Sequence, residues 1–75
     1  MRAYVLINVG SGEELSVTRS LKGVPGILKA SFTFGPFDVI CEVEAPDLAG
    51  LGKLVSGTIR ATPGVIETVT CLQVA

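Results

Sequence analysis

The stretch GPFDVICEVEAPD, residues 35–47, contains a turn, a strand and the start of a helix. Apolar side chains occupy every odd position in 37–43, and this period of two is typical of a strand with two different faces. The Gly-Pro pair at 35–36 favours a hairpin turn, and the Pro-Asp pair at 46–47 favours a helix N-terminus. We therefore expect a strand over residues 37–45, between a hairpin and a helix.

The segments on either side predict the other elements. Ser11 or Gly12 is the expected cap of a first helix, because both precede the acidic residues that favour a helix N-terminus. The second helix, opened by Asp47, is expected to end at the TPGV turn. The expected strands cover residues 3–9, 27–34, 37–45 and 65–74, and the expected helices lie within residues 10–23 and 46–61.

An internal repeat indicates how these elements pack. LKGVPGI at residues 21–27 matches IRATPGV at residues 59–65, with Pro-Gly at the same place in both segments. A β-α-β unit used twice predicts an α+β, ferredoxin-like βαββαβ sandwich. Its four-stranded antiparallel sheet has the strand order 4-1-3-2 and carries both helices on one face. The chain is short enough that we expect residues 1–75 to form a single domain.

The composition excludes several classes of partner. The net charge is −1 and no basic patch occurs, so no direct nucleic-acid binding is expected. No apolar run approaches the length of about 20 residues that a membrane helix needs, so we expect no membrane partner and a cytoplasmic location. Hydrophobic residues are 48% of the chain and charged residues 17%, which suggests that another chain covers part of the surface.

The two cysteines predict no special chemistry. The expected strand order separates Cys41 from Cys71 by a whole strand, which is too far for a disulfide, so both are expected to be buried free thiols. The chain contains no histidine, and nothing completes a metal-ligand set. We expect no metal, no cofactor and no catalytic residues, and therefore no enzyme.

Side-chain alternation predicts an apolar sheet face that no helix covers. The odd positions of the strand at 37–45, together with Val5, Ile7 and Val9, are expected to face the helices. The other face is expected to hold Tyr4, Leu6, Leu28, Ala30, Phe32, Phe34, Ile40, Ile66, Leu72 and Val74, together with the polar residues Asn8, Glu42, Glu44, Thr68 and Thr70. Such a patch predicts a face-to-face homodimer. Its expected interface residues are Tyr4, Leu6, Phe32, Phe34, Ile40 and Leu72.

A bulge could change the face assignment of the strand at 27–34. Ile27, Ser31 and Thr33 are the alternative set for the uncovered face.

Asp38 has two possible roles. As a residue just after a Gly-Pro turn, it could cap the hairpin through a local hydrogen bond to the backbone. It could also bind a cationic ligand at the edge of the apolar interface. The spacing alone favours the cap.

Several segments together resemble a known family. AYVLINV at 3–9, VPGI at 24–27, GPFDVICEVEAPDL at 35–48 and TPGVIETVTCLQV at 62–74 resemble the effector-binding domain of the Lrp/AsnC transcription regulators, also called the RAM domain. The resemblance covers the whole chain and is greatest to the stand-alone form that lacks the helix-turn-helix.

This resemblance implies a function. Domains of the family form sheet-to-sheet dimers that assemble into rings, often octamers, and they bind free amino acids between dimers. The resemblance implies that Gly35 and Asp38 lie at the effector site, with Asp38 near the ammonium group and with Pro36 and Phe37 shaping the loop. Thr68 and Thr70 are implied contacts to the ligand or to the neighbouring dimer. A full-length Lrp/AsnC regulator is an implied partner. The resemblance also makes ligand binding, rather than capping of the turn, the preferred role of Asp38.

The sequence departs from the family pattern at two positions. Phe34 stands where a small polar residue is frequent, and Phe37 stands where tyrosine is frequent, so the loop lacks one hydroxyl.

Three alternatives to an amino-acid-binding domain of this family stay open. They are an adaptor oligomer without a ligand, a small dimeric enzyme on the same topology, and an ACT-type amino-acid domain with its glycine loop in NVGSGEE at 8–14.

Overall fold

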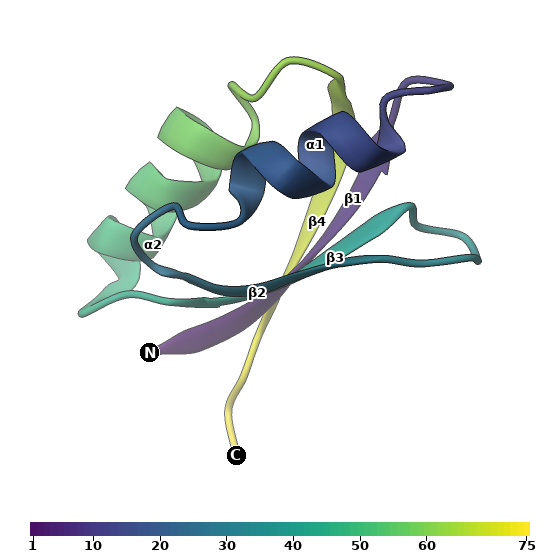
Figure 1. Ribbon diagram of the computed structural model, residues 1–75. Coiled ribbons are helices and arrows are strands. Elements are labelled where there is room, and N and C mark those ends of the chain that lie inside the picture. Colours follow the sequence, from purple (N-terminus) through teal and green to yellow (C-terminus); the bar gives the residue numbers. More distant parts are fainter.

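The computed structural model describes all residues of the chain, 1–75, and has the predicted order of elements. Two helices lie on one side of a four-stranded antiparallel sheet, which is the ferredoxin-like α+β fold (Figure 1). Neither helix has the length and apolar character that crossing a membrane requires. The elements are β1 Arg2–Val9, α1 Glu14–Leu21, β2 Ile27–Phe32, β3 Val39–Glu44, α2 Leu48–Leu54, the π-helix η1 Val55–Ile59 and β4 Val65–Leu72.

The sheet has the strand order β2-β3-β1-β4, which is the predicted order. The central strands β1 and β3 are therefore paired on both sides, whereas β2 and β4 each have one free edge. Figure 1 shows α1 and α2 on the same side of this sheet. The opposite surface carries no helix, and we call it the open face.

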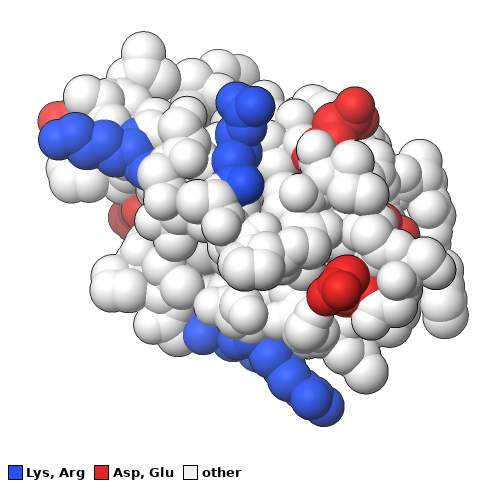
Figure 2. All heavy atoms as spheres, turned by 90° about the horizontal axis from the view of Figure 1, so that it is seen from above, with Lys and Arg blue, Asp and Glu red and all other residues white.

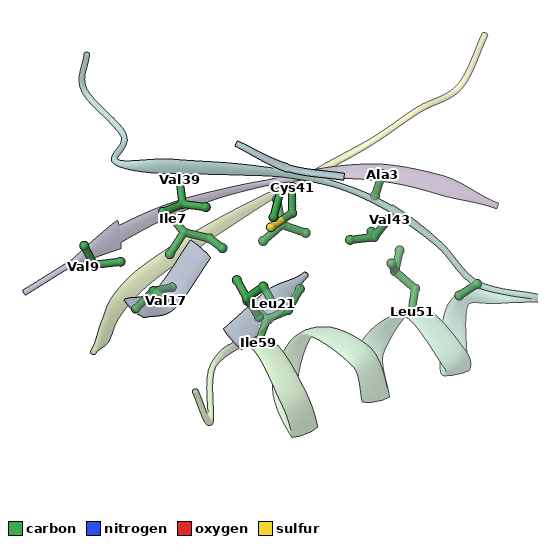
Figure 3. Close-up of a cluster of buried hydrophobic side chains, with 13 residues drawn as sticks. Ala3, Ile7, Val9, Val17, Leu21, Val39, Cys41, Val43, Leu51 and Ile59 are labelled. Carbon is green, nitrogen blue, oxygen red and sulfur yellow. The ribbon is translucent and has the colours of Figure 1, made fainter. Parts of the chain in front are cut away.

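The hydrophobic core lies between the sheet and the helices (Figure 3). Odd-numbered residues of β1 and β3 point toward the helices, as the alternation predicted. Burial of each valine or isoleucine side chain among them stabilises the fold by about 1.5–3 kcal/mol. The largest fully buried side chains are those of Val5, Ile7, Val17, Leu21, Val39, Cys41, Val43 and Ile59.

The two helices begin in different ways. The Asp47 carboxylate accepts a hydrogen bond of 2.7 Å from the Gly50 N–H, so the predicted cap of α2 is confirmed. The predicted cap of α1 is wrong, because the helix begins later, at Glu14, and its N-cap residue makes no side-chain cap. Gly12 instead donates its N–H to the Glu14 side chain at 2.8 Å. Both helices are also shorter than the segments within which they were expected.

Each outer strand contains a bulge directly after its Pro-Gly turn. The register of β2 against β3 shifts between Ile27 and Lys29, and the register of β4 against β1 shifts where Val9 pairs with Val65 and Asn8 with Glu67. The residues skipped are Leu28 and Ile66, which occupy equivalent positions in the internal repeat. The repeat therefore includes the bulge as well as the turn.

These bulges correct the predicted faces of both outer strands. One extra residue moves every following side chain to the opposite face. Phe32 lies opposite Val39, and Leu72 lies opposite Ala3, so both are on the helix-bearing side, where they were not expected. For the same reason Ala30, Thr68 and Thr70 also face that side, and Ala30 is buried.

The open face is consequently less apolar than expected. Tyr4, Leu6 and Ile40 lie on it as predicted, whereas Phe34 lies in the β2–β3 loop. Of the alternative set, Ser31 joins the open face, and Ile27 packs against the core. The uncharged side chains that the register places on the open face are Tyr4, Leu6, Asn8, Ser31, Ile40, Val69 and Cys71.

Gly64 is a position where alanine should destabilise the fold. Its φ is +97°, and an added Cβ would stand 2.9 Å from the Val17 Cγ2 atom. We expect Gly64→Ala to lower the free energy of unfolding by about 2 kcal/mol or more, because it combines backbone strain with a clash against the core. Urea denaturation followed by circular dichroism measures the change.

Gly52→Ala is the matched control, because nothing lies within 4 Å of an added Cβ there. The control should be neutral or should stabilise α2 by up to about 1 kcal/mol. Equal effects of both substitutions would contradict the close approach of Gly64 to α1.

Candidate ligand-binding site

The β2–β3 loop is closed by Thr33 and Asp38. The Thr33 N–H donates to the Asp38 carbonyl at 2.9 Å, and the Thr33 hydroxyl donates to the Phe37 carbonyl at 2.8 Å. Gly35 has a φ of +150°, which residues with a side chain rarely adopt. Hydrogen bonds therefore close the GPFD segment at its ends, and Gly35 permits the backbone conformation of the turn between them.

The Asp38 side chain makes a long-range contact. Its Oδ2 atom accepts a hydrogen bond of 2.9 Å from the backbone N–H of Val9, and its own N–H donates to the Ile7 carbonyl at 2.9 Å. The carboxylate thus fastens the loop to the end of β1 and does not cap its own turn, so the local-cap interpretation is wrong. Oδ1 makes no hydrogen bond within the chain and can accept one from a ligand.

Two phenylalanines form the outer side of the loop. The Phe34 side chain is 99% exposed, and its ring packs edge-to-face on Phe32 with 5.7 Å between the ring centroids. Phe37 is half-buried beside Asp38. The loop therefore carries one fully exposed aromatic ring and one partly used carboxylate, which are the kinds of group that bind a small amphipathic molecule.

Thr68 and Thr70 lie apart from this loop. They belong to β4 and lie opposite Ile7 and Val5 of β1. Asp38 directly precedes β3, which lies on the other side of β1. One strand therefore separates Asp38 from Thr68, which corresponds to about 10 Å across the sheet. The structure brings Gly35, Pro36, Phe37 and Asp38 together, but within one chain it does not bring the two threonines to them.

A small hollow adjoins Thr68. It has a volume of about 270 Å³ and is lined by Arg60, Val65, Ile66, Glu67 and Thr68. The sequence reasoning did not identify Arg60 or Glu67, because neither belongs to a motif. Only the turn that returns the chain from η1 to β4 places the two charges together.

The cysteines have different environments. Cys41 is fully buried in the core, and burial raises the pKa of its thiol from 9.0 to about 11. Cys71 is exposed on the edge strand β4, so the expectation that both thiols are buried is wrong for Cys71. Both are free, as predicted, and no group of three or more metal-binding side chains is clustered anywhere.

The thiols should differ in reactivity. We expect at most one thiol per native chain to react with a disulfide reagent near neutral pH, because Cys41 is both inaccessible and held as the unreactive thiol. Labelling kinetics with and without urea test this expectation, and Cys71→Ser should abolish labelling of the native protein. Two thiols that react equally fast without urea would contradict the buried position of Cys41.

The comparisons with known proteins identify the family of the chain. The family model described as the Lrp/AsnC ligand binding domain matches residues 2–74. An uncharacterised HTH-type transcriptional regulator of Pyrococcus furiosus is 28% identical over 74 residues, covering 95% of this chain and 49% of the relative. This chain thus spans about half the length of that curated relative.

Solved structures share the fold. A hypothetical protein of Pyrococcus horikoshii superimposes with a TM-score of 0.91 at 27% identity, covering 99% of this chain and 89% of the other. A transcriptional regulator of Neisseria meningitidis, solved as a complex with L-methionine, has a TM-score of 0.86 at 14% identity and is covered over 49% of its length. This protein belongs to the family of Lrp/AsnC ligand-binding domains, whose members bind effectors in a regulatory role.

Proposed function

We propose that this chain is a non-enzymatic sensor of free amino acids, with Asp38 as the acceptor for the ammonium group of the effector. One observation carries the proposal: the Asp38 carboxylate uses Oδ2 to hold Val9 and leaves Oδ1 unused, at a loop that Thr33 closes and phenylalanines border. A carboxylate held in this way is already oriented, so little ordering is needed when a cation binds.

Membership of the family supports this function, as does the L-methionine bound to the Neisseria meningitidis regulator. Gly35, Pro36 and Phe37 shape the pocket around the effector. Thr68 and Thr70 of a neighbouring dimer complete it, because within one chain they lie across β1 from Asp38. The effector therefore binds at a seam between dimers.

The open face forms the dimer. Leu6, Ile40 and Val69 are neighbours across three strands and give this surface an apolar centre, with Tyr4 beside it. Dimers assemble further into a ring such as an octamer. Residues 1–75 act as one domain in the cytoplasm, without direct contact to nucleic acid or membrane, and modulate a full-length Lrp/AsnC regulator.

A thermal-shift panel of the amino acids found in proteins, each with its α-keto analogue, tests the sensor. An effector present at about a hundred times its dissociation constant should stabilise the fold by roughly 2.7 kcal/mol. We expect a shift for one or a few amino acids and none for their α-keto analogues. Asp38→Asn should abolish the shift, because the amide keeps an acceptor for Val9 but loses the charge.

Light scattering tests the assembly. The wild type should have a mass of at least twice that of one chain, and Tyr4→Glu together with Val69→Glu should reduce it, because the register places both side chains on the open face. A flat ligand panel from an intact oligomer would contradict sensing and favour the ligand-free adaptor. A monomeric wild type would contradict the proposal that the effector binds between dimers.

A further inference from the structure

All three phenylalanines of the chain lie at the β2–β3 loop. Phe32 ends β2, Phe34 follows within the loop, and Phe37 precedes Asp38. The Phe34 side chain is 99% exposed and packs edge-to-face on Phe32, which is itself 44% exposed. Because an exposed aromatic ring keeps apolar area in contact with water, binding of an apolar group to this loop is favourable.

Phe34 and Asp38 belong to the same closed loop. The Thr33 N–H donates to the Asp38 carbonyl, so the two ends of the segment 33–38 meet, and Phe34 directly follows this closure. Val9 occupies Asp38 Oδ2, which leaves Oδ1 for a cation. A molecule bound to Oδ1 therefore lies at the loop that also carries the Phe34 ring.

The loop has few polar side chains left for a ligand. The Thr33 hydroxyl already donates to the Phe37 carbonyl at 2.8 Å. Gly35, Pro36 and the phenylalanines have no polar side chain, and a carboxylate such as that of Asp38 only accepts hydrogen bonds. An effector whose side chain contains a carbonyl or carboxylate would lose bonds to water and find no side-chain donor in the loop.

The charges at this end of the molecule also disfavour a charged effector side chain. Asp38 is the only charged residue of the segment 33–38, so a second cationic group would find no second carboxylate in the loop. Glu67 lies opposite Asn8, across β1 from Asp38. Figure 2 shows acidic side chains mainly over the end of the molecule that holds the loop in Figure 1, away from most of the basic ones. A second carboxylate on the effector would be repelled there.

We propose that the effector is an amino acid with a large apolar side chain, and that Phe34 selects it by packing against that side chain. This inference rests on the proposed function, because it takes Asp38 as the acceptor of the ammonium group. It makes Phe34 the residue that determines specificity, at a position where this chain departs from the family pattern. Contact with an aromatic ring favours an aromatic effector over an aliphatic one.

Isothermal titration calorimetry of the whole chain with single amino acids tests the preference. The probes are L-phenylalanine, L-leucine, L-serine, L-glutamate and L-arginine. We expect L-phenylalanine and L-leucine to bind, with dissociation constants lower than those of the other three by about tenfold or more. L-Arginine is the strictest competitor, because its guanidinium group can stack on an aromatic ring.

Variants of Phe34 test its role. Phe34→Ser should raise the dissociation constant of L-phenylalanine about tenfold, because the packing against the ring is lost. Phe34→Leu keeps an apolar side chain and should retain most of the binding of L-leucine. Since Phe34 is exposed, both variants should unfold at the same urea concentration as the wild type.

Leu48→Ser is the matched control. Leu48 is also a large apolar residue that is mostly exposed, at 64%, but it begins α2, which follows the opposite end of β3 from the loop. Figure 1 shows the start of α2 and the β2–β3 loop at different ends of the molecule. The control should bind L-phenylalanine as the wild type does.

Several results would overturn the proposal and leave the sensor intact. One is a wild type that binds a small, polar or charged amino acid more tightly than L-phenylalanine and L-leucine. Others are unchanged binding of L-phenylalanine by Phe34→Ser, or an equal loss in Leu48→Ser. A lower oligomer mass of Phe34→Ser would assign the ring to a contact between chains. Failure of the sensor is a different result, because then no amino acid binds the wild type, and this proposal fails with it.

Discussion

Asp38→Ala is expected to lower the free energy of unfolding by about 1–3 kcal/mol, because it removes the acceptor of a partly buried backbone N–H. The Val9 N–H donates its hydrogen bond to Asp38 Oδ2 over 2.9 Å, and the two residues are 29 positions apart in the sequence. For a domain of this size, each kcal/mol corresponds to a shift of about 4–8 °C in Tm. Differential scanning calorimetry measures the loss.

The comparison with Asp38→Asn separates the two roles of this residue. Asparagine retains a carbonyl acceptor for Val9, so we expect it to lose less than half of the stability that alanine loses. Both variants should fail to respond to an amino-acid effector, since neither carries the charge. An Asp38→Ala protein as stable as the wild type would contradict the structural role, and an Asp38→Asn protein that still responds would contradict the sensing role.

Ile59→Ala should have the largest effect on stability. Ile59 ends η1, is fully buried and lies in the core with Leu21 and Leu51 (Figure 3). Removal of such a side chain costs about 2–5 kcal/mol, because it loses burial and leaves a cavity. A domain of this size has a total stability of only about 4–11 kcal/mol, so the variant should lose a large share of its free energy of unfolding.

Urea denaturation at low temperature measures this effect, with Ile66→Ala as the control. Ile66 is the bulge residue of β4, and its side chain is 71% exposed. The control should stay within about 0.5 kcal/mol of the wild type, as exposed substitutions usually do. A loss below about 1 kcal/mol for Ile59→Ala would mean that the end of η1 does not pack against the sheet.

The internal repeat accounts for how much of the fold was predictable. Alternation over residues 37–43 placed Val39, Cys41 and Val43 in the core, and the repeated Pro-Gly turns indicated two equivalent β-α-β units. These are local patterns, and each agrees with the sheet order found. The bulges were less visible, because Leu28 and Ile66 are apolar and fit either face of a strand.

The candidate site was predictable only in part. The resemblance indicated the loop of Gly35 and Asp38, and the structure gives that loop a fixed shape. Neither spacing nor resemblance indicated that Asp38 bonds to Val9, since hydrogen bonds between distant segments leave no periodic signal. The predicted sheet face was wrong for Phe32, Leu72, Thr68 and Thr70. One extra residue in each outer strand moves the side chains that follow it to the opposite face.

By itself, the sequence determined which elements form, their order and the family, because turn chemistry and apolar periodicity act over a few residues at a time. The tertiary structure decided which side chains share a surface. The register between strands sets the faces of β2 and β4, and it also sets the partner of Asp38 and the free edge beside α1. Register depends on how the whole sheet packs, so a shift of one residue can redirect side chains without a change in local pattern.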